Sequence, residues 1–180
     1  MNSYSSTNPN TLTPLNKLLH STLFAALISI CSQIIIPLPF IPINMALFGV
    51  FLAGSLLGPV YGSLSVIIYC LLGLVGAPVF AGFRGGLSHL VGMTGGFIAG
   101  YIFTALVTGF LTRKKKSKPR LAIAMSLGLL ICYIIGSLWF MFVTGNNWGS
   151  TLIYCVFPFI IGDIIKIILA IILTLRLKQI

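Results

Sequence analysis

The sequence predicts an all-α membrane protein that folds as a bundle of six transmembrane helices. Hydrophobic residues make up 58% of the 180-residue chain, and only 7% of the residues are charged. About a quarter of the residues of a typical soluble domain are charged, and these groups cover its surface. This chain has too few charged residues for such a surface, so its outer face must contact lipid.

Six apolar segments account for the predicted helices, because a membrane span needs about 20 mostly apolar residues. The run 43–75 is too long for one span, and Gly58-Pro59 near its middle predicts the turn of a hairpin between two short helices. The six predicted helices cover residues 18–36, 43–57, 60–75, 94–112, 121–143 and 159–177.

The segments between these helices carry strong breaking signals. Residues 37–42 contain three prolines, which end a helix because proline lacks the amide donor. The glycine-rich stretch 76–93 is too irregular to face lipid, so we expect it to fold against protein or to line a wet cavity. Residues 144–150 predict a polar turn, and 151–157 a short interfacial helix.

The basic residues predict the topology. The net charge is +10, and six of the 11 Lys and Arg residues lie between Arg113 and Arg120. A short basic loop between spans is typical of the cytoplasmic side, so nucleic acid is not an expected partner. With six spans, both termini also lie on the cytoplasmic side, together with Lys17, Arg176 and Lys178. The loops 37–42, 76–93 and 144–158 then lie outside. We expect a multi-pass protein of the cell membrane, with a disordered cytoplasmic tail over 1–16 and a single domain over 17–180.

Asp163 and Lys166 form the sharpest candidate site. Asp163 is the only acidic residue of the chain, and Lys166 follows it by three positions, on the same face of a helix. Ionisable groups within a span are rare and usually face the bundle interior or a water-filled cavity. The pair indicates either a ligand site or an ion pair that only fixes the last helix.

Arg84 is the one charged residue of the glycine-rich stretch. Gly82, Gly85 and Gly86 allow the backbone near it to approach a ligand closely. An arginine suits a carboxylate, which it can hold through two parallel hydrogen bonds. The alternative is an arginine that contacts water or lipid phosphate. The pattern is not a Walker motif, since no Gly-Lys-Ser/Thr follows.

Two further polar residues are candidates for ligand contact. Asn44 stands at the start of the second predicted helix, and Tyr69 lies within the third. Asn44 could bind a ligand or cap its helix. Tyr69 could donate to a ligand or simply pack with its hydroxyl bonded.

Small and polar residues recur every four positions along the first predicted helix, where Ser21, Ala25 and Ser29 are followed by Gln33. Small residues at this spacing let another helix approach closely. They indicate either packing within the bundle or a docking face for a second membrane protein.

Catalytic and metal chemistry find little support. With a single acid, the chain has no carboxylate pair and no Ser-His-Asp set, so an enzyme is not expected. The four cysteines and two histidines stand singly, without metal-ligand spacing. We therefore expect neither a metal nor a cofactor.

Seven segments stand out together: 52–59 (LAGSLLGP), 69–73 (YCLLG), 76–82 (GAPVFAG), 84–87 (RGGL), 94–97 (TGGF), 158–159 (PF) and 162–166 (GDIIK). In this order they closely resemble the BioY family, the biotin-specific substrate-binding subunits (S-components) of energy-coupling-factor (ECF) transporters. The likeness covers roughly residues 18–175. The family often has Thr at the position of Asn44 and Gln at Ala46, two departures that bear on pocket contacts from the second helix, and it often has Pro at Met93.

The resemblance implies a six-helix S-component that binds biotin from outside and docks on a transmembrane coupling protein with two ATPases. The docking residues would be Ala25 and Ser29 on the first helix. Two other readings stay open: an S-component for a different vitamin, and a stand-alone carrier that forms homo-oligomers.

Biotin also fits the residues identified above. Its carboxylate needs a cation, either Arg84 or Lys166, and its ureido N–H groups need an acceptor such as Asp163. Phe80 and Tyr69 could form the apolar wall. We expect Asp163, Lys166 and Arg84 to share one ligand site, whose excess positive charge an anionic ligand neutralises.

Overall fold

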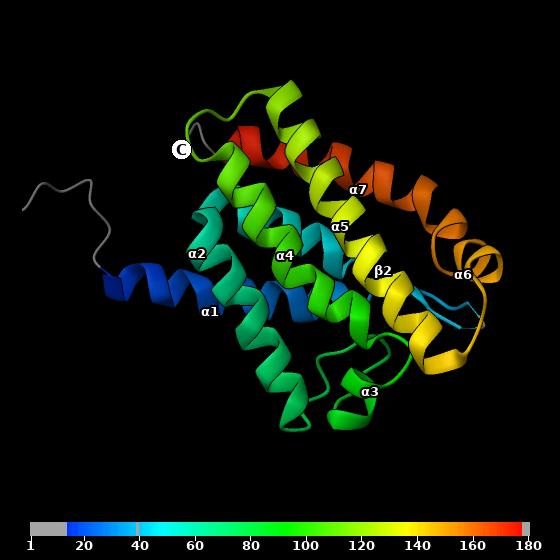
Figure 1. Cartoon of the computed structure of the whole chain (residues 1–180). Coiled ribbons are helices and arrows are strands. Elements are labelled where there is room, and N and C mark those ends of the chain that lie inside the picture. Colours follow the sequence, from blue (N-terminus) through cyan, green and yellow to red (C-terminus); the bar gives the residue numbers. More distant parts are fainter. Residues whose placement is uncertain (1–13, 39, 178–180) are drawn as a thin grey trace, which may run out of the picture.

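The structure is a computed structural model that describes residues 14–38 and 40–177. Most of the described chain is helical, and two short strands form a small hairpin (Figure 1). In chain order the elements are α1 (Pro14–Ser32), β1 (Ile35–Ile36), β2 (Ile43–Asn44), α2 (Ala46–Leu74), α3 (Leu87–Val91), α4 (Gly95–Thr112), α5 (Lys118–Thr144), α6 (Trp148–Cys155) and α7 (Phe157–Leu177).

Within the described chain, five helices are long and apolar enough to cross a membrane: α1, α2, α4, α5 and α7. Helix α2 is broken at Gly58, whose φ of 82° and ψ of −176° are not helical. This φ favours glycine, and Pro59 follows it where a new helical segment can begin. The predicted turn is therefore confirmed, and the two halves of α2 bring the bundle to six apolar helical segments.

The two halves of α2 pack closely beside the break. A β-carbon added at Gly62 would lie 2.8 Å from the Cα atom of Gly54. A β-carbon at Gly54 would in turn lie 2.6 Å from the carbonyl oxygen of Ala105 on α4. Such distances leave no room for a side chain, so glycine permits this backbone contact, as small residues do in membrane bundles.

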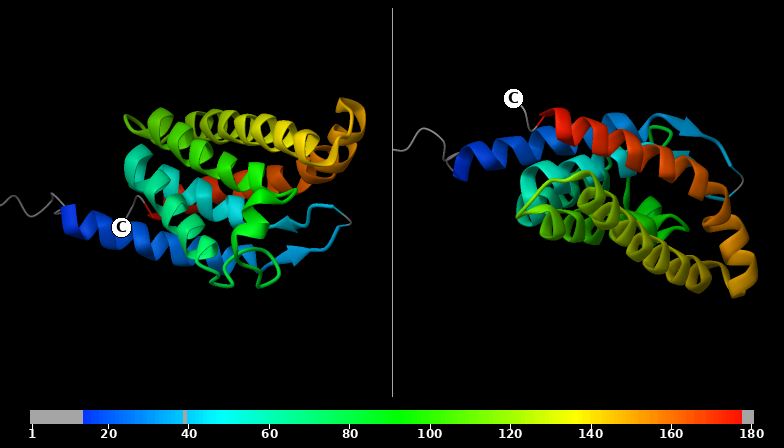
Figure 2. Two further views of the ribbon diagram at one scale, coloured as in Figure 1. Left: turned by 60° about the horizontal axis from the view of Figure 1, so that its bottom comes forward. Right: turned by 90° about the horizontal axis from the view of Figure 1, so that it is seen from above.

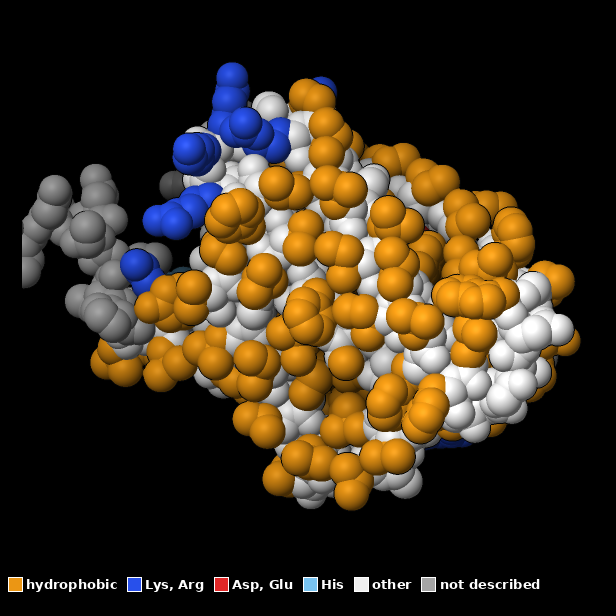
Figure 3. All heavy atoms as spheres, viewed as in Figure 1, with side chains coloured by type: hydrophobic (Ala, Val, Ile, Leu, Met, Phe, Trp, Pro, Cys, Tyr) orange, Lys and Arg blue, Asp and Glu red, His pale blue; other side chains and the backbone are white. Residues whose placement is uncertain are grey.

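The connections between helices gather at two ends of the bundle. Figures 1 and 2 show the start of α1, the α4–α5 connection and the end of α7 towards one end, and the β-hairpin, α3 and α6 towards the other. The blue side chains of Lys and Arg cluster at the first end in Figure 3, while orange hydrophobic side chains are spread over much of the remaining visible face. This separation is the one that the basic loop 113–120 predicted.

The first connection differs from the prediction. Helix α1 ends at Ser32 rather than at 36, and Ile35–Ile36 forms a strand that pairs with Ile43–Asn44. The predicted second helix therefore starts at Ala46 instead of 43. The reason is local, because β-branched isoleucines suit a strand and the prolines between the two strands prevent a helix from continuing.

The other boundaries follow the prediction closely, with α4, α5, α6 and α7 within a few residues of the expected ranges. The glycine-rich stretch 76–93 is irregular apart from the single short helix α3. Residues 1–13 of the predicted tail lie outside the described residues, while 14–16 form the first turn of α1.

Candidate functional site

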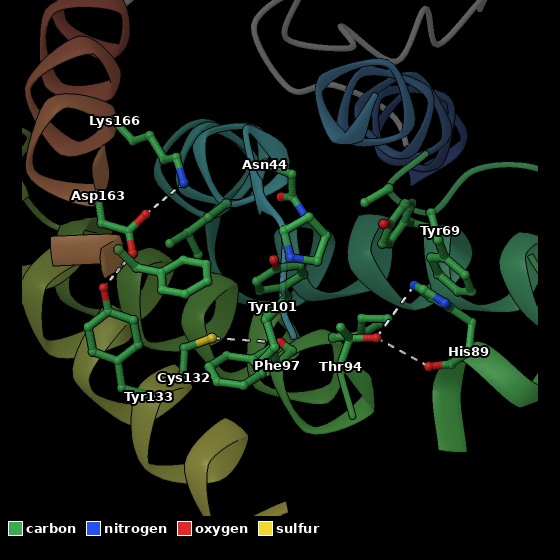
Figure 4. A pocket seen from close by; sticks show the side chains of 17 residues that line it. Asn44, Tyr69, His89, Thr94, Phe97, Tyr101, Cys132, Tyr133, Asp163 and Lys166 are labelled. Atoms are coloured by element: carbon green, nitrogen blue, oxygen red, sulfur yellow. Dashed lines mark hydrogen bonds and ion pairs between the residues drawn. The ribbon is translucent and has the colours of Figure 1, made fainter. Parts of the chain in front are cut away.

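A cavity lies inside the bundle, near the end that carries the β-hairpin and α3. Its volume is about 50 Å³, which is more than a single water molecule needs. Its walls come from the hairpin and from α2, α3, α4, α5 and α7, so residues far apart in sequence meet there (Figure 4). The lining residues are Ile41, Pro42, Asn44, Leu47, Tyr69, Phe80, Ala81, His89, Thr94, Phe97, Ile98, Tyr101, Cys132, Tyr133, Phe159, Asp163 and Lys166.

One side of the cavity holds a buried ion pair. The Nζ atom of Lys166 lies 2.7 Å from Oδ1 of Asp163, and both residues are less than 5% exposed. The hydroxyl of Tyr133 donates to Oδ2 of the same carboxylate at 2.5 Å. A carboxylate can accept about four hydrogen bonds and an ammonium can donate three, so both groups retain capacity for a ligand.

The other side of the cavity is aromatic (Figure 4). Phe80 is 1% exposed and lies between Tyr69, in an edge-to-face contact at 5.4 Å, and the ring of His89, stacked at 5.2 Å. Thr94 Oγ1 lies 3.4 Å from Nε2 of His89. Burial and the nearby positive charge of Arg84 lower the pKa of His89, so this imidazole is neutral at pH 7.

Asn44 lies on a strand between these two sides. Its Oδ1 accepts a hydrogen bond from the backbone N–H of Ala46 at 3.0 Å, which satisfies a free amide of the first turn of α2. Asn44 also lines the cavity. The N-cap position of α2 is Met45, so Asn44 supports the start of the helix from one residue before the cap while it also lines the cavity.

Comparison with known proteins identifies the chain. A model of the BioY family matches residues 4–180. The chain belongs to the BioY family. It is 40% identical to "Probable biotin transporter BioY" of Pyrococcus horikoshii, with 87% of this chain and 92% of the relative covered. It is 39% identical to "Biotin transporter BioY" of Thermotoga maritima, with 92% and 97% covered.

A solved structure of similar fold supports the same family. It is described as a crystal structure of the S-component for biotin from an ECF-type ABC transporter, and the TM-score is 0.85 at 31% sequence identity. The match covers 94% of this chain and 96% of that protein. The predicted resemblance to BioY and the predicted six-helix membrane fold are therefore confirmed.

Within this BioY chain, the structure brings together five of the residues that the sequence singled out for ligand contact. They come from the β-hairpin, α2, the following loop and α7, and all line the cavity: Asn44, Tyr69, Phe80, Asp163 and Lys166.

Four other predicted residues are not among those that line the cavity. The side chain of Arg84 is exposed on the loop after α2, and Gly82, Gly85 and Gly86 belong to the same loop. The expectation of an excess positive charge inside the site is therefore wrong, because Arg84 does not line the cavity. The cavity carries one carboxylate and one ammonium, whose charges cancel.

Sequence reasoning missed several residues of the cavity wall. Tyr101, Tyr133, Phe97 and Cys132 lie on α4 and α5 and face the ion pair or the aromatic side (Figure 4). Two tyrosines within otherwise apolar spans were a usable signal, because a buried phenol needs a hydrogen-bond partner. Thr94 and His89 were also missed as cavity residues.

The small residues predicted for docking on α1 have a different environment. Ser21 and Ala25 are both 0% exposed, and the Ser21 hydroxyl donates to the carbonyl of Tyr61 on α2 at 3.1 Å. These two residues therefore pack within their own bundle, while Ser29 is only partly buried. In this conformation the exposed small residue of the same turn is Ala26.

Proposed function

We propose that this chain is a high-affinity biotin-binding membrane subunit that mediates biotin uptake as an S-component. The observation that carries the proposal is a buried ion pair with no net charge, which lies beside an aromatic wall in a single cavity. Biotin has a matching build, with a ureido group that offers two N–H donors and one carbonyl, an apolar sulfur ring and an anionic carboxylate. The names of the BioY relatives point to the same ligand.

The ureido group is the part of biotin that suits Asp163 and Lys166. Asp163 can accept its N–H groups, and Lys166 can donate to its carbonyl. A second carboxylate beside the pair would leave the buried site with a net negative charge, which is strongly disfavoured. A neutral group with donors and an acceptor avoids that cost.

The carboxylate of biotin then belongs on the aromatic side of the cavity. Arg84 exchanges two backbone hydrogen bonds with Phe80, so it belongs to the same turn as a residue of this wall. A valerate chain that passes Phe80 and Tyr69 would carry its carboxylate towards this guanidinium. Arg84 therefore remains part of the proposed site as a contact at its edge.

The charge distribution supports an orientation in the cell membrane. The basic residues of 113–120, Lys17 and Arg176 are expected on the cytoplasmic side, because positive loops resist translocation. The cavity lies towards the other end of the bundle, so it would receive biotin from outside. Uptake would then require an ECF coupling protein and ATPase subunits on the cytoplasmic side.

A calorimetric titration of the purified chain with biotin tests the proposal. The sharpest variant changes Asp163→Asn and Lys166→Met together, because removing only one partner leaves an unpaired buried charge and endangers the fold. We expect the double variant to fold and to lose at least about a hundredfold in biotin affinity, from two charge-assisted bonds. Lys115→Met, at the basic end, is the matched control. Wild-type affinity in a folded double variant would refute the proposed site.

Two rival functions are separated by similar measurements. A panel of other vitamins titrated against the same protein identifies an S-component of different specificity. Biotin uptake in cells that lack the coupling protein and ATPases identifies a stand-alone carrier, and the mass of the purified particle shows whether such a carrier is a homo-oligomer.

A further inference from the structure

Gln33, the residue after α1, contacts the loop that follows α2. Its Nε2 lies 3.1 Å from the carbonyl oxygen of Val79 and 3.2 Å from that of Phe80. Its Oε1 accepts a hydrogen bond from the backbone N–H of Phe83 at 2.8 Å. This amide orientation follows from the partners, since a backbone N–H can only donate and a carbonyl can only accept.

The loop segment that Gln33 holds is a tight turn. Phe80 and Arg84 exchange two backbone hydrogen bonds, of 2.9 and 3.3 Å, around Gly82 and Phe83. Phe83 has a φ of 56°, and it is the one non-glycine residue of the described chain with a positive φ. This conformation is unfavourable for a bulky side chain.

Packing of the Phe83 ring does not explain the strained conformation, because that side chain is 73% exposed. The hydrogen bond from its N–H to Gln33 is the contact that favours it. Ser32, the last residue of α1, adds a second link, since its hydroxyl donates to the carbonyl oxygen of Val79. The end of α1 therefore holds this turn through its main chain.

The turn between Phe80 and Arg84 also positions the aromatic wall of the cavity. Phe80 begins the turn, and its side chain lies between Tyr69 and His89 inside the cavity. Gln33 is not among the residues that line the cavity. Its contact with the ligand site is thus indirect, through the backbone of Phe80.

We infer that Gln33 is a positioning residue that keeps the 78–84 turn closed and thereby slows the release of the ligand. Release requires the Phe80 wall to move, and such a movement breaks the hydrogen bonds to Gln33. Two neutral hydrogen bonds, one on the Nε2 side and one on the Oε1 side of the Gln33 amide, correspond to a change of about fivefold to a hundredfold in a rate or equilibrium constant. The identification of the ligand as biotin rests on the proposed function, whereas the contact between Gln33 and the 78–84 turn does not.

The test uses the purified full chain and the variant Gln33→Met, which keeps the length of the side chain and removes its hydrogen bonds. We expect radiolabelled biotin to dissociate about fivefold to a hundredfold faster, with a smaller change in the association rate. In the absence of biotin, backbone hydrogen exchange over 78–84 should be faster in the variant than in wild type. The melting temperature of the variant should stay close to that of wild type. Ile34→Met, at the exposed neighbouring residue, is the control.

A second substitution separates positioning from general structural support. Phe83→Gly in the Gln33→Met background removes the unfavourable φ, so it should restore part of the slow dissociation. If Gln33→Met does not fold, Gln33→Asn withdraws the amide by one methylene and gives the same comparison.

Three results would overturn the inference: unchanged hydrogen exchange over the turn, unchanged dissociation, or a general loss of stability without rescue by Phe83→Gly. A wild-type chain that does not bind biotin would refute the proposed function instead, and the hydrogen exchange would still test the contact of Gln33.

Discussion

The hydroxyl of Tyr133 on α5 donates to Oδ2 of Asp163 on α7 at 2.5 Å, across 30 residues of sequence. The other oxygen of the same carboxylate accepts a hydrogen bond from Lys166, which lies on the same helix. Asp163 therefore has a local partner and a tertiary partner, and its orientation in the cavity depends on both. The contact also ties α5 to α7 beside the proposed ligand site.

We predict that Tyr133→Phe destabilises the ligand-free protein by about 1–3 kcal/mol, because a buried carboxylate loses one of its donors. Thermal unfolding in detergent measures the effect. Tyr154→Phe is the matched control, since the Tyr154 side chain is 39% exposed. Equal melting temperatures for the two variants would contradict a stabilising role for this hydrogen bond.

Arg84 is predicted to bind the carboxylate of biotin. Arg84→Met should weaken biotin binding by about tenfold to a hundredfold, because a charge-assisted hydrogen bond is lost. Biotin amide should bind wild type more weakly than biotin, and the Arg84→Met variant should discriminate less between the two. Calorimetry of both ligands on both proteins completes the cycle. Full discrimination by the variant would instead assign the carboxylate to Lys166.

The orientation of the chain is predicted to place 113–120 in the cytoplasm. A cysteine at Ser117 should resist an impermeant thiol reagent in intact cells and react after permeabilisation. A cysteine at Ser88 on α3, an exposed position, should react in intact cells. The wild-type chain provides the background from its four cysteines. The reverse labelling pattern would invert the proposed topology.

Ala25 and Ala26 are predicted to respond oppositely to enlargement. Ala25→Trp should destabilise the protein by about 1–3 kcal/mol or more, because the side chain would enter a packed interior. Ala26→Trp, on the exposed side of the same turn, should leave the melting temperature and biotin binding close to wild type. Thermal unfolding of the two variants checks this. If the Ala25→Trp protein is stable and fails only to assemble with a coupling protein, Ala25 belongs to the docking face after all.

The sequence by itself determined the features that depend on short stretches of chain. The length of each apolar run set the spans, and Gly58-Pro59 marked the break in α2 because only glycine readily adopts its φ. The proximity of Asp163 and Lys166 was predictable as well, since residues three apart on a helix lie on one face. The motifs around them were enough for the family.

The tertiary structure alone decided which way each helix faces. In a soluble helix the polar side marks the exterior, but here the residues that face lipid and most residues that face the interior are apolar, so hydrophobic periodicity separates the two faces poorly. For this reason the sequence could not tell that Ser21 and Ala25 face inward. It also could not bring Tyr133 to Asp163, or show that Arg84 is exposed and outside the cavity lining, because those positions depend on packing between segments that are distant along the chain.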